Sequence, residues 1–331
     1  MERWQDYLKK DSINWLLASN PWTRYKTLTD LLNRTETDPE VIETKQELID
    51  NNRIRDLIQT TAKWFPEKPK RHDDAKMSHY KLRMLADFGL TIEYKPIKDI
   101  VLKAKAHQDD ILFAIRQDIP DKSKNNETPQ AAWNALPCDS PLMTYILLAL
   151  GDDGKDVMDT VDFFKDQWKK KEGWFCNLFF VRSQYKKLQV GCPMAGLMSL
   201  EIFSLFDEKN NLEYIENCYH PLKFHREYGK SLYYFGRSKR FWTLKYPFVW
   251  YNALYIGDVL SRFSLFKDEE LLKDIIDWII NSQDSEGRFR PTSMFREYKE
   301  WGFANKKEPS PWITFLAYRI LKRWHEHSAI D

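Results

Sequence analysis

Glycine is scarce in this chain, with 11 among 331 residues. That scarcity disfavours all-β folds and glycine-rich phosphate-binding loops, because both depend on glycine in their tight turns. Long apolar runs are also missing: no stretch reaches about 18 apolar residues, so we expect no membrane-spanning helix. The opening residues Met1–Asp6 contain no apolar run, so we expect no secretory signal peptide either.

Neither sign of charge dominates, since 51 basic and 49 acidic residues leave a formal net charge of +2. This balance argues against bulk attraction to nucleic acid, so we expect no nucleic-acid partner. The cysteines form no Cys-x-x-Cys pair; they are Cys138, Cys176, Cys192 and Cys218. We interpret them as reduced thiols of a cytoplasmic protein.

Proline, by contrast, marks a repeated pattern. Similar short apolar phrases begin at Pro21, Pro141, Pro193, Pro247 and Pro311, and Lys76–Tyr80 fits as a sixth without its proline. Proline is favoured at the first position of a helix, and Asn20, Ser140 and Ser310 precede three of these prolines as good N-caps. The pattern predicts helix starts at 21, 76, 141, 193, 247 and 311, and such regular spacing indicates a repeat architecture.

Two kinds of helical segment alternate along the chain. Segments after the prolines, such as Pro193–Phe206 and Pro247–Phe263, are apolar nearly all round, as buried helices are. More polar helical segments lie between them, at Arg3–Leu17, Val41–Thr61 (with a break near Asn51), Ile97–Ala106, Val157–Lys169, Leu212–Tyr228 and Glu269–Asn281. This alternation predicts an all-α fold. We expect one α/α toroid domain over residues 1–331, with six apolar inner helices inside an amphipathic outer ring.

The ends of the polar helices also repeat. Gln283–Phe289 follows one of them, and Lys171–Phe175 and Lys63–Pro66 follow two others, each with aromatic residues. Gln283–Phe289 is similar to the Gln-x-x-x-Gly-x-Phe/Trp repeat of terpenoid cyclases and protein prenyltransferase subunits. The chain therefore resembles their α/α toroid superfamily. The same layout serves some glycoside hydrolases and polysaccharide lyases, so the fold does not settle function.

The resemblance is incomplete at the sites of chemistry. The Asp-x-Asp-Asp of squalene-hopene-type cyclases is missing from the sequence. Phe235–Arg240 is similar to the Gly-Arg-x-x-Lys segment of protein prenyltransferases, which implies that Arg237 and Arg240 contact a diphosphate. Thr243–Tyr246 stand where that family places zinc ligands, so zinc is not expected, while magnesium stays open. Asp152–Asp156 matches Asp-Asp-x-x-Asp formally, but we interpret it as a solvated turn around Gly154.

Parallel inner helices would gather their N-termini around one mouth, which favours an anion there. Just before or within these helix starts lie the candidate catalytic groups Asp73, Asp74, Asp139 and His79. They are the residue types of general acids or metal ligands, whereas Asp74 and Asp139 are equally ordinary N-caps.

Aromatic residues make up 15% of the chain and include 13 tryptophans. The first turns of the predicted inner helices hold the candidate ligand-binding rings Trp22, Tyr25, Tyr80, Tyr145, Trp250 and Trp312. Such rings line a central cavity or pack as core. Arg24 is the one charge inside an otherwise apolar first turn, so it needs a partner or an anionic ligand, and it is the best single candidate for a functional residue.

Three hypotheses follow. The first is a prenyltransferase- or terpenoid-cyclase-like protein that holds an isoprenoid, or another apolar ligand with an anionic head, in its central cavity. The second is a carbohydrate-active enzyme that uses two of the rim carboxyls. The third is a scaffold without catalysis. We favour the first, while catalysis itself, of transferase or lyase type, stays open.

Overall fold

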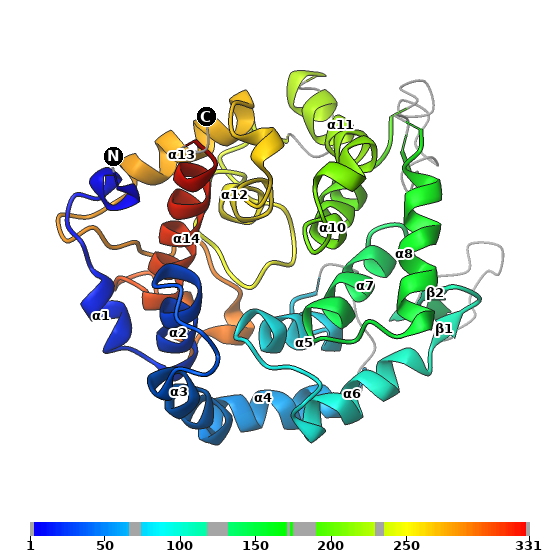
Figure 1. The fold of residues 1–331 in the computed structure, drawn as a ribbon, viewed down its shortest axis with the longest axis horizontal. Coiled ribbons are helices and arrows are strands. Elements are labelled where there is room, and N and C mark those ends of the chain that lie inside the picture. Colours follow the sequence, from blue (N-terminus) through cyan, green and yellow to red (C-terminus); the bar gives the residue numbers. More distant parts are fainter. Residues whose placement is uncertain are drawn as a thin grey trace, which may run out of the picture. The chain divides into compact units, whose positions relative to one another are not determined.

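The computed structural model describes residues 3–65, 74–117, 132–170, 173–174, 190–228 and 235–328. These residues are mostly helical, which confirms the predicted all-α class (Figure 1). The chain forms two compact units. One, here called the terminal unit, combines Met1–Arg55 with Arg226–Asp331; the other, the middle unit, is Asp56–His225.

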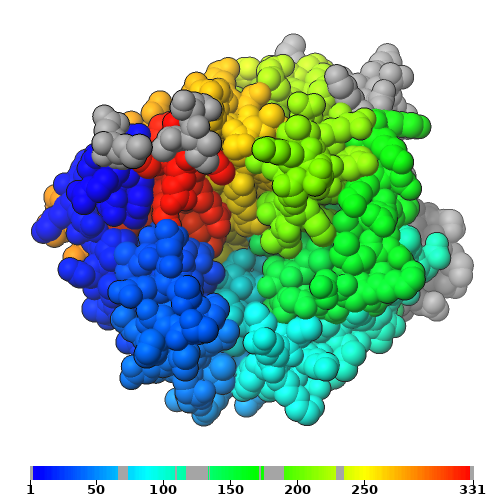
Figure 2. Space-filling model, viewed as in Figure 1, coloured from blue at the N-terminus to red at the C-terminus, as the bar shows by residue number. Residues whose placement is uncertain are grey.

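In the terminal unit, short helices at the start of the chain meet the last helices of the chain. Its elements are η1 (Trp4–Tyr7), α1 (Ile13–Leu17), α2 (Pro21–Lys26), the π-helical turn η2 (Thr27–Leu31), α3 (Pro39–Asp50), α12 (Ala253–Leu260), η4 (Ser264–Phe266), α13 (Glu270–Asn281), η5 (Arg296–Tyr298), η6 (Gly302–Ala304) and α14 (Pro311–Ser328). Helix α14 packs against α2, α12, α13 and the N-terminal segment, and Figure 2 shows that segment in blue against α14 in red.

The middle unit is built around α7. Its elements are α5 (Ser78–Asp87), α6 (Lys95–Lys105), β1 (Gln108–Asp109), β2 (Leu112–Phe113), β3 (Ile115–Gln117), β4 (Ala132–Asn134), α7 (Asp139–Ala149), α8 (Lys155–Gln167), α10 (Pro193–Phe203) and η3 (Lys209–Asn211). Helix α7 packs against α5, α8 and α10 (Figure 1). The strands pair as two antiparallel hairpins, β1 with β2 and β3 with β4. The boundaries between the units fall within α4 (Asn52–Ala62) and α11 (Leu212–Tyr228).

Proline places three helix starts as predicted. Helices α2, α10 and α14 begin at Pro21, Pro193 and Pro311. The Asn20 side chain caps α2 by accepting a hydrogen bond from the Thr23 amide at 3.0 Å. Two further starts differ from the predicted positions by two residues. Helix α5 begins at Ser78 rather than at position 76, and α7 begins at Asp139 rather than at position 141.

The start predicted at Pro247 is wrong. Helix α12 begins at Ala253, because Asn252 is the residue that caps it: the Asn252 side chain accepts a hydrogen bond from the Tyr255 amide at 3.0 Å. The amphipathic helices agree more closely with the sequence. Helix α11 spans Leu212–Tyr228 as predicted, and the expected break at Asn51 separates α3 from α4. Arg3–Leu17, however, forms only the short helices η1 and α1.

The loop after α13 ties the N-terminal segment to α14. The Gln283 side chain accepts from the Lys9 amide at 3.0 Å and donates to the Tyr7 carbonyl at 3.0 Å. The Tyr318 hydroxyl lies 3.0 Å from the Gly287 carbonyl, to which it donates. Burial raises the pKa of Tyr318 to about 12, so this hydroxyl stays a donor at neutral pH. The Gln-x-x-x-Gly-x-Phe segment therefore links the N-terminal segment to α14 by hydrogen bonds.

Gly287→Ala is expected to disrupt these hydrogen bonds and destabilise the protein. Gly287 has a φ of +73°, a conformation that costs an alanine about 1–2 kcal/mol. An added Cβ would also lie 2.0 Å from the Lys10 carbonyl oxygen, so the N-terminal segment must move. Urea unfolding measures the loss. Gly302→Ala is the matched control, because nothing lies within 4 Å of its added Cβ. Equal midpoints for the two variants would contradict the role of Gly287.

Candidate functional site

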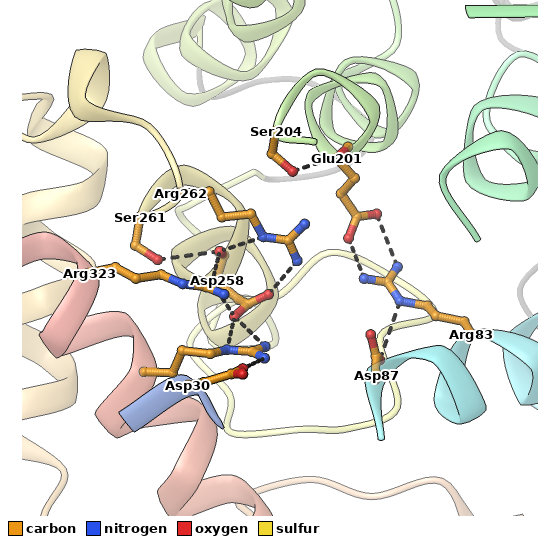
Figure 3. Close-up of polar contacts among 10 residues, drawn as sticks. Asp30, Arg83, Asp87, Glu201, Ser204, Asp258, Ser261, Arg262 and Arg323 are labelled. Carbon is orange, nitrogen blue, oxygen red and sulfur yellow. Dashed lines mark hydrogen bonds and ion pairs between the residues drawn. The ribbon is translucent and has the colours of Figure 1, made fainter. Parts of the chain in front are cut away.

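A wholly buried aspartate on α12 collects three arginines in the terminal unit (Figure 3). Asp258 Oδ1 accepts from Arg319 Nε at 3.0 Å, from Arg319 Nη2 at 2.7 Å and from Arg323 Nη1 at 3.2 Å. Its Oδ2 accepts from Arg262 Nη2 at 2.7 Å. One carboxylate is thus shared by three guanidinium groups that come from the end of α12 and one face of α14.

Two of these arginines also complete the last turn of α12. The Asp258 carbonyl accepts from Ser261 Oγ at 3.3 Å, from Arg262 Nε at 3.2 Å and from Arg323 Nη1 at 3.3 Å. Carbonyls at a helix end lack intrahelical partners and carry the negative end of the helix dipole. Arginine is therefore favoured here for two reasons: it pairs with the buried carboxylate, and it donates to a carbonyl at the end of the helix that has no intrahelical partner.

A second carboxylate joins from the π-helical turn η2. Asp30 pairs with Lys26 at 2.7 Å and with Arg319 Nη1 at 3.2 Å. Lys322 Nζ donates to the Asp30 carbonyl at 2.7 Å and to Asn33 Oδ1 at 2.6 Å. A π turn widens the helix by one residue and is frequent at functional sites. Here η2 follows α2 directly and carries Asp30, which pairs with Arg319 on α14.

The assembled group carries more positive than negative charge. We call it the Asp258 cluster; its members are Lys26, Asp30, Asp258, Arg262, Arg319, Lys322 and Arg323. Five of these seven side chains are cationic and two are carboxylates. Glu326, half exposed and 3.6 Å from Lys322, adds one further negative charge at the margin. Among the residues that the structure describes, the cationic side chains of this cluster outnumber the carboxylates that they meet.

The electrostatics of the cluster keep its two carboxylates, Asp30 and Asp258, ionised at neutral pH. Burial alone would raise the pKa of Asp258, but Arg319, Arg262 and Arg323 together hold it well below the ordinary 3.8. Burial opposes ionisation of Asp30 likewise, yet Lys26 and Arg319 lower its pKa far below 3.8. Burial, followed by the charge of Arg319, lowers the pKa of Arg323 to about 10.

The middle unit holds a separate buried ion pair. Arg83 on α5 donates through Nη1 to Glu201 Oε2 on α10 at 3.1 Å, and its Nη2 pairs with Glu201 Oε1 (Figure 3). Asp87 lies 3.7 Å from Arg83 Nε, and the Tyr145 ring lies 5.5 Å from the guanidinium carbon. Both charges are wholly buried, so the pair fixes α5 to α10 rather than meeting solvent.

The predicted catalytic groups lie in the middle unit. Asp73 falls outside the described residues. Asp74 has a turn role, since its Oδ1 accepts from the Lys76 amide at 3.1 Å just before α5. Asp139 lies in the first turn of α7 with 1% of its surface exposed, and His79 on α5 is wholly buried. A carboxyl as enclosed as that of Asp139 is out of reach of bulk solvent.

His79 packs among aromatic rings. Its ring centroid lies 4.0 Å from that of Tyr80 and 5.8 Å from that of Phe65. Tyr80 is buried as well, and Tyr145 lies against Arg83. The predicted residues of this unit are therefore brought together as interior packing of α5 and α7.

Two predicted ligand-binding tryptophans are core residues of the terminal unit. Trp22 is 4% exposed, and its ring centroid lies 5.3 Å from that of Trp301. Trp312 is 1% exposed and lies 5.5 Å from Tyr246 and 5.0 Å from Phe315. Such edge and offset contacts are the preferred packing of aromatic side chains.

Tyr25 and Trp250 differ in their access to solvent. Tyr25 is buried and donates its hydroxyl proton to Glu36. Trp250 is half-buried, with its ring 5.0 Å from that of Tyr251. Of the predicted aromatic set, Trp250 is thus the ring best placed to meet a ligand.

Arg24 has protein partners. Its Nε donates to Thr44 Oγ1 at 3.1 Å, and its Nη2 pairs with Glu47, both on α3. The charge inside the apolar turn of α2 is therefore met by the neighbouring helix. An anionic ligand is not needed to explain it.

Arg237 and Arg240 lie on the surface of the terminal unit. Arg237 donates to the carbonyls of Arg226 at 3.0 Å and of Glu227 at 3.1 Å, which caps the end of α11. The Arg240 amide donates to Ser238 Oγ at 3.2 Å. The loop that holds these arginines therefore caps the carboxyl-terminal end of α11.

The acidic segment before α8 is a turn, as predicted. Lys105 Nζ lies 2.8 Å from Asp152 Oδ2 and 2.9 Å from Asp156 Oδ1, so a lysine already sits between the carboxylates. The Gly154 amide donates to Asp152 Oδ1 at 3.2 Å. Among the residues that the structure describes, no group of three His, Cys, Asp or Glu side chains is arranged to hold a metal ion.

The most deeply buried charged residues were not among the candidates that the sequence suggested. Asp258 and Glu201 each lie within a segment that the sequence marks as apolar all round, and Arg83 and Arg319 interrupt similar runs. A single charge inside a buried helix is costly unless it is paired. That rule, applied to every inner helix rather than to Arg24 alone, would have found all four.

No protein-family model matches the sequence, and a search of the curated proteins finds no match either. Within the described ranges, no helix combines the length and the apolar content needed to cross a bilayer.

Proposed function

We propose that this protein binds a small ligand with an anionic head and an apolar body, the class to which isoprenoid diphosphates belong. The observation that carries the proposal is the Asp258 cluster, in which, among the described residues, five cationic side chains meet the carboxylates of Asp30, Asp258 and, at the margin, Glu326. Bringing like charges together in a partly dry site is unfavourable unless an anion joins them.

The same proposal includes a single α/α toroid of six hairpins over residues 1–331, similar to terpenoid cyclases and protein prenyltransferase subunits. It is supported by the proline starts of α2, α10 and α14 and by the near-complete burial of α10 and α12. The ligand body would lie in the centre of that ring, near the half-buried Trp250. A cytoplasmic location is part of the proposal and rests on the spacing of the cysteines.

The carbohydrate-enzyme hypothesis is less well supported. It needs two carboxyl groups that reach a sugar and a water molecule. Asp139 is 1% exposed, and Asp74 accepts a hydrogen bond from the turn before α5. These placements are typical of structural carboxyls, so we rank anion binding first.

A thermal-shift screen tests the proposal. Farnesyl and geranylgeranyl diphosphate, with and without magnesium, are compared with inorganic diphosphate, farnesol and uronic oligosaccharides. Ligand at about 100 times its dissociation constant adds about 2.7 kcal/mol to the free energy of unfolding. We expect prenyl diphosphates to raise the unfolding temperature more than inorganic diphosphate or farnesol does. A shift with oligosaccharides alone would overturn the proposal in favour of a carbohydrate site.

A further inference from the structure

We propose that Arg116 and Trp64 bind the carboxylate of a small organic acid whose apolar body packs against Phe65 and Trp133. These four residues all belong to the middle unit, whereas the Asp258 cluster belongs to the terminal unit. The inference therefore goes beyond the proposed function and does not depend on it. None of the four was among the candidate site residues that the sequence suggested.

Arg116 on β3 is a half-buried cation with one edge of its guanidinium group unused. Its Nη1 donates to the Phe65 carbonyl at 3.2 Å. Its Nε is enclosed by the protein and has no hydrogen-bond partner. Among the residues that the structure describes, no carboxylate lies within ion-pair distance of this guanidinium group. A half-buried charge without a counter-ion is unfavourable, so a carboxylate against the Nε edge stabilises it.

Trp64 supplies a second donor. It follows α4 and is 7% exposed. Within the described ranges, its Nε1 is buried and has no hydrogen-bond partner. An indole N–H can only donate, and an unpaired buried donor is costly. A carboxylate carries one negative charge and two acceptor oxygens, which matches the one guanidinium group of Arg116 and the one indole N–H of Trp64.

Phe65 is the common neighbour of these donors. The Trp64 ring lies edge-on to the Phe65 ring with centroids 5.3 Å apart. Trp133 stands opposite Arg116 in the β3–β4 ladder, and its ring centroid lies 5.6 Å from that of Phe65. Cross-strand partners lie on one face of a hairpin, so Arg116 and Trp133 reach Phe65 together. His107 stacks on Trp133 with centroids 3.4 Å apart, which fixes the orientation of that indole.

The backbone at Trp64 and Phe65 is held in an unfavourable conformation. Their φ angles are +39° and +55°, in the left-handed region that large side chains rarely adopt. The Phe65 amide donates to Ser78 Oγ at 2.7 Å, and the Phe65 carbonyl accepts from Arg116. Such conformations persist where surrounding contacts fix them, and they are concentrated at ligand sites. The strain therefore agrees with a site at this segment.

The helix ends beside the segment do not exclude an anion. Trp64 follows the carboxyl-terminal end of α4, where Lys103 Nζ donates to the Ala62 carbonyl at 2.7 Å. The lysine charge offsets the negative end of that helix. The same segment meets the first turn of α5, because Ser78 accepts from the Phe65 amide. A first turn carries positive partial charge, which favours a carboxylate nearby.

Isothermal titration of the full chain with benzoate, acetate and inorganic phosphate tests the site. We expect benzoate to bind most tightly, because it carries a single charge and a ring that packs against Phe65 and Trp133. Arg116→Gln should weaken benzoate binding about tenfold or more, as loss of a charge-assisted hydrogen bond does. Trp64→Phe keeps a ring but removes the N–H, so it should weaken binding about threefold or more. Lys98→Gln is the matched control, because Lys98 is an exposed cation of α6 in the same unit.

The possible outcomes decide the inference on their own. Benzoate binding that Arg116→Gln and Trp64→Phe both retain at unaltered affinity would overturn the site, and so would failure of the unaltered protein to bind either carboxylate. Phosphate binding tighter than that of both carboxylates would overturn the choice of a carboxylate.

Two variants keep the test open if Arg116→Gln does not fold. Arg116→Lys keeps the charge without the planar fork, so intermediate affinity is expected. Unaltered affinity in both Arg116→Lys and Trp64→Phe would count against the site. The titration uses no prenyl ligand, so this inference and the proposed function can fail separately.

Discussion

Asp258→Ala is expected to destabilise the protein by about 3–5 kcal/mol, the usual cost of leaving a buried charge without its partner. The substitution removes the carboxylate that accepts from Arg262, Arg319 and Arg323 and leaves three cations facing one another. Chemical unfolding followed by circular dichroism measures the loss.

Asp268→Ala provides the control for the same unit. Asp268 pairs with Lys273 at 2.8 Å, but 73% of its side chain is exposed, so solvent replaces the lost interaction. Its unfolding midpoint should match that of the unaltered protein. An Asp258→Ala midpoint that also matched would show that the three arginines do not depend on this carboxylate.

The lowered pKa values of Asp258 and Asp30 predict that the free energy of unfolding decreases in acid. Their pKa values in the folded chain lie below the ordinary 3.8, which the unfolded chain retains. The unfolded state therefore binds more protons than the folded state once the pH falls below that value, so folding stability decreases in this direction. The contribution is complete above about pH 5, and Asp258→Ala should flatten part of the decrease below it.

Glu201→Ala is expected to cost about 3–5 kcal/mol in the middle unit, for a related reason. Arg83 and Glu201 are both wholly buried, so Arg83 would keep a charge without the carboxylate that accepts from two of its nitrogens. Thermal and urea unfolding measure the effect. Glu216→Ala is the control, because Glu216 is an exposed residue of α11.

A double replacement separates the loss of the pair from the loss of packing. Arg83→Met with Glu201→Leu removes both charges and keeps apolar volume, and replacing a buried ion pair in this way is often neutral or stabilising. We expect the double variant to be clearly more stable than Glu201→Ala. If the two are equally unstable, the ion pair is not the reason for the sensitivity of this position.

Helix boundaries were the part of the fold that local rules predicted best. Proline at the first position sets the starts of α2, α10 and α14, and amphipathic spacing alone marks Leu212–Tyr228. These signals act between residues a few positions apart. The same rules failed at Pro247, where the capping side chain of Asn252 begins α12 instead.

The candidate site was not predictable by these means. Arg24 was selected because it interrupts an apolar turn, yet Asp258 and Glu201 interrupt longer apolar helices and are more deeply buried. The sequence marks that a buried charge needs a partner, but it does not say which one. Arg319 meets Asp258 across 61 positions and Asp30 across 289.

The sequence by itself determined the helical class and several helix boundaries, because these depend on capping, proline geometry and the periodicity of apolar residues. Only the tertiary structure decided which charges meet. Whether Arg24 faces a ligand or Glu47, and whether Asp258 neutralises one arginine or three, depends on how helices distant in the chain pack. The pairs of Asp258 with Arg319 and Arg323 follow from position in space, which the sequence separation of these residues does not indicate.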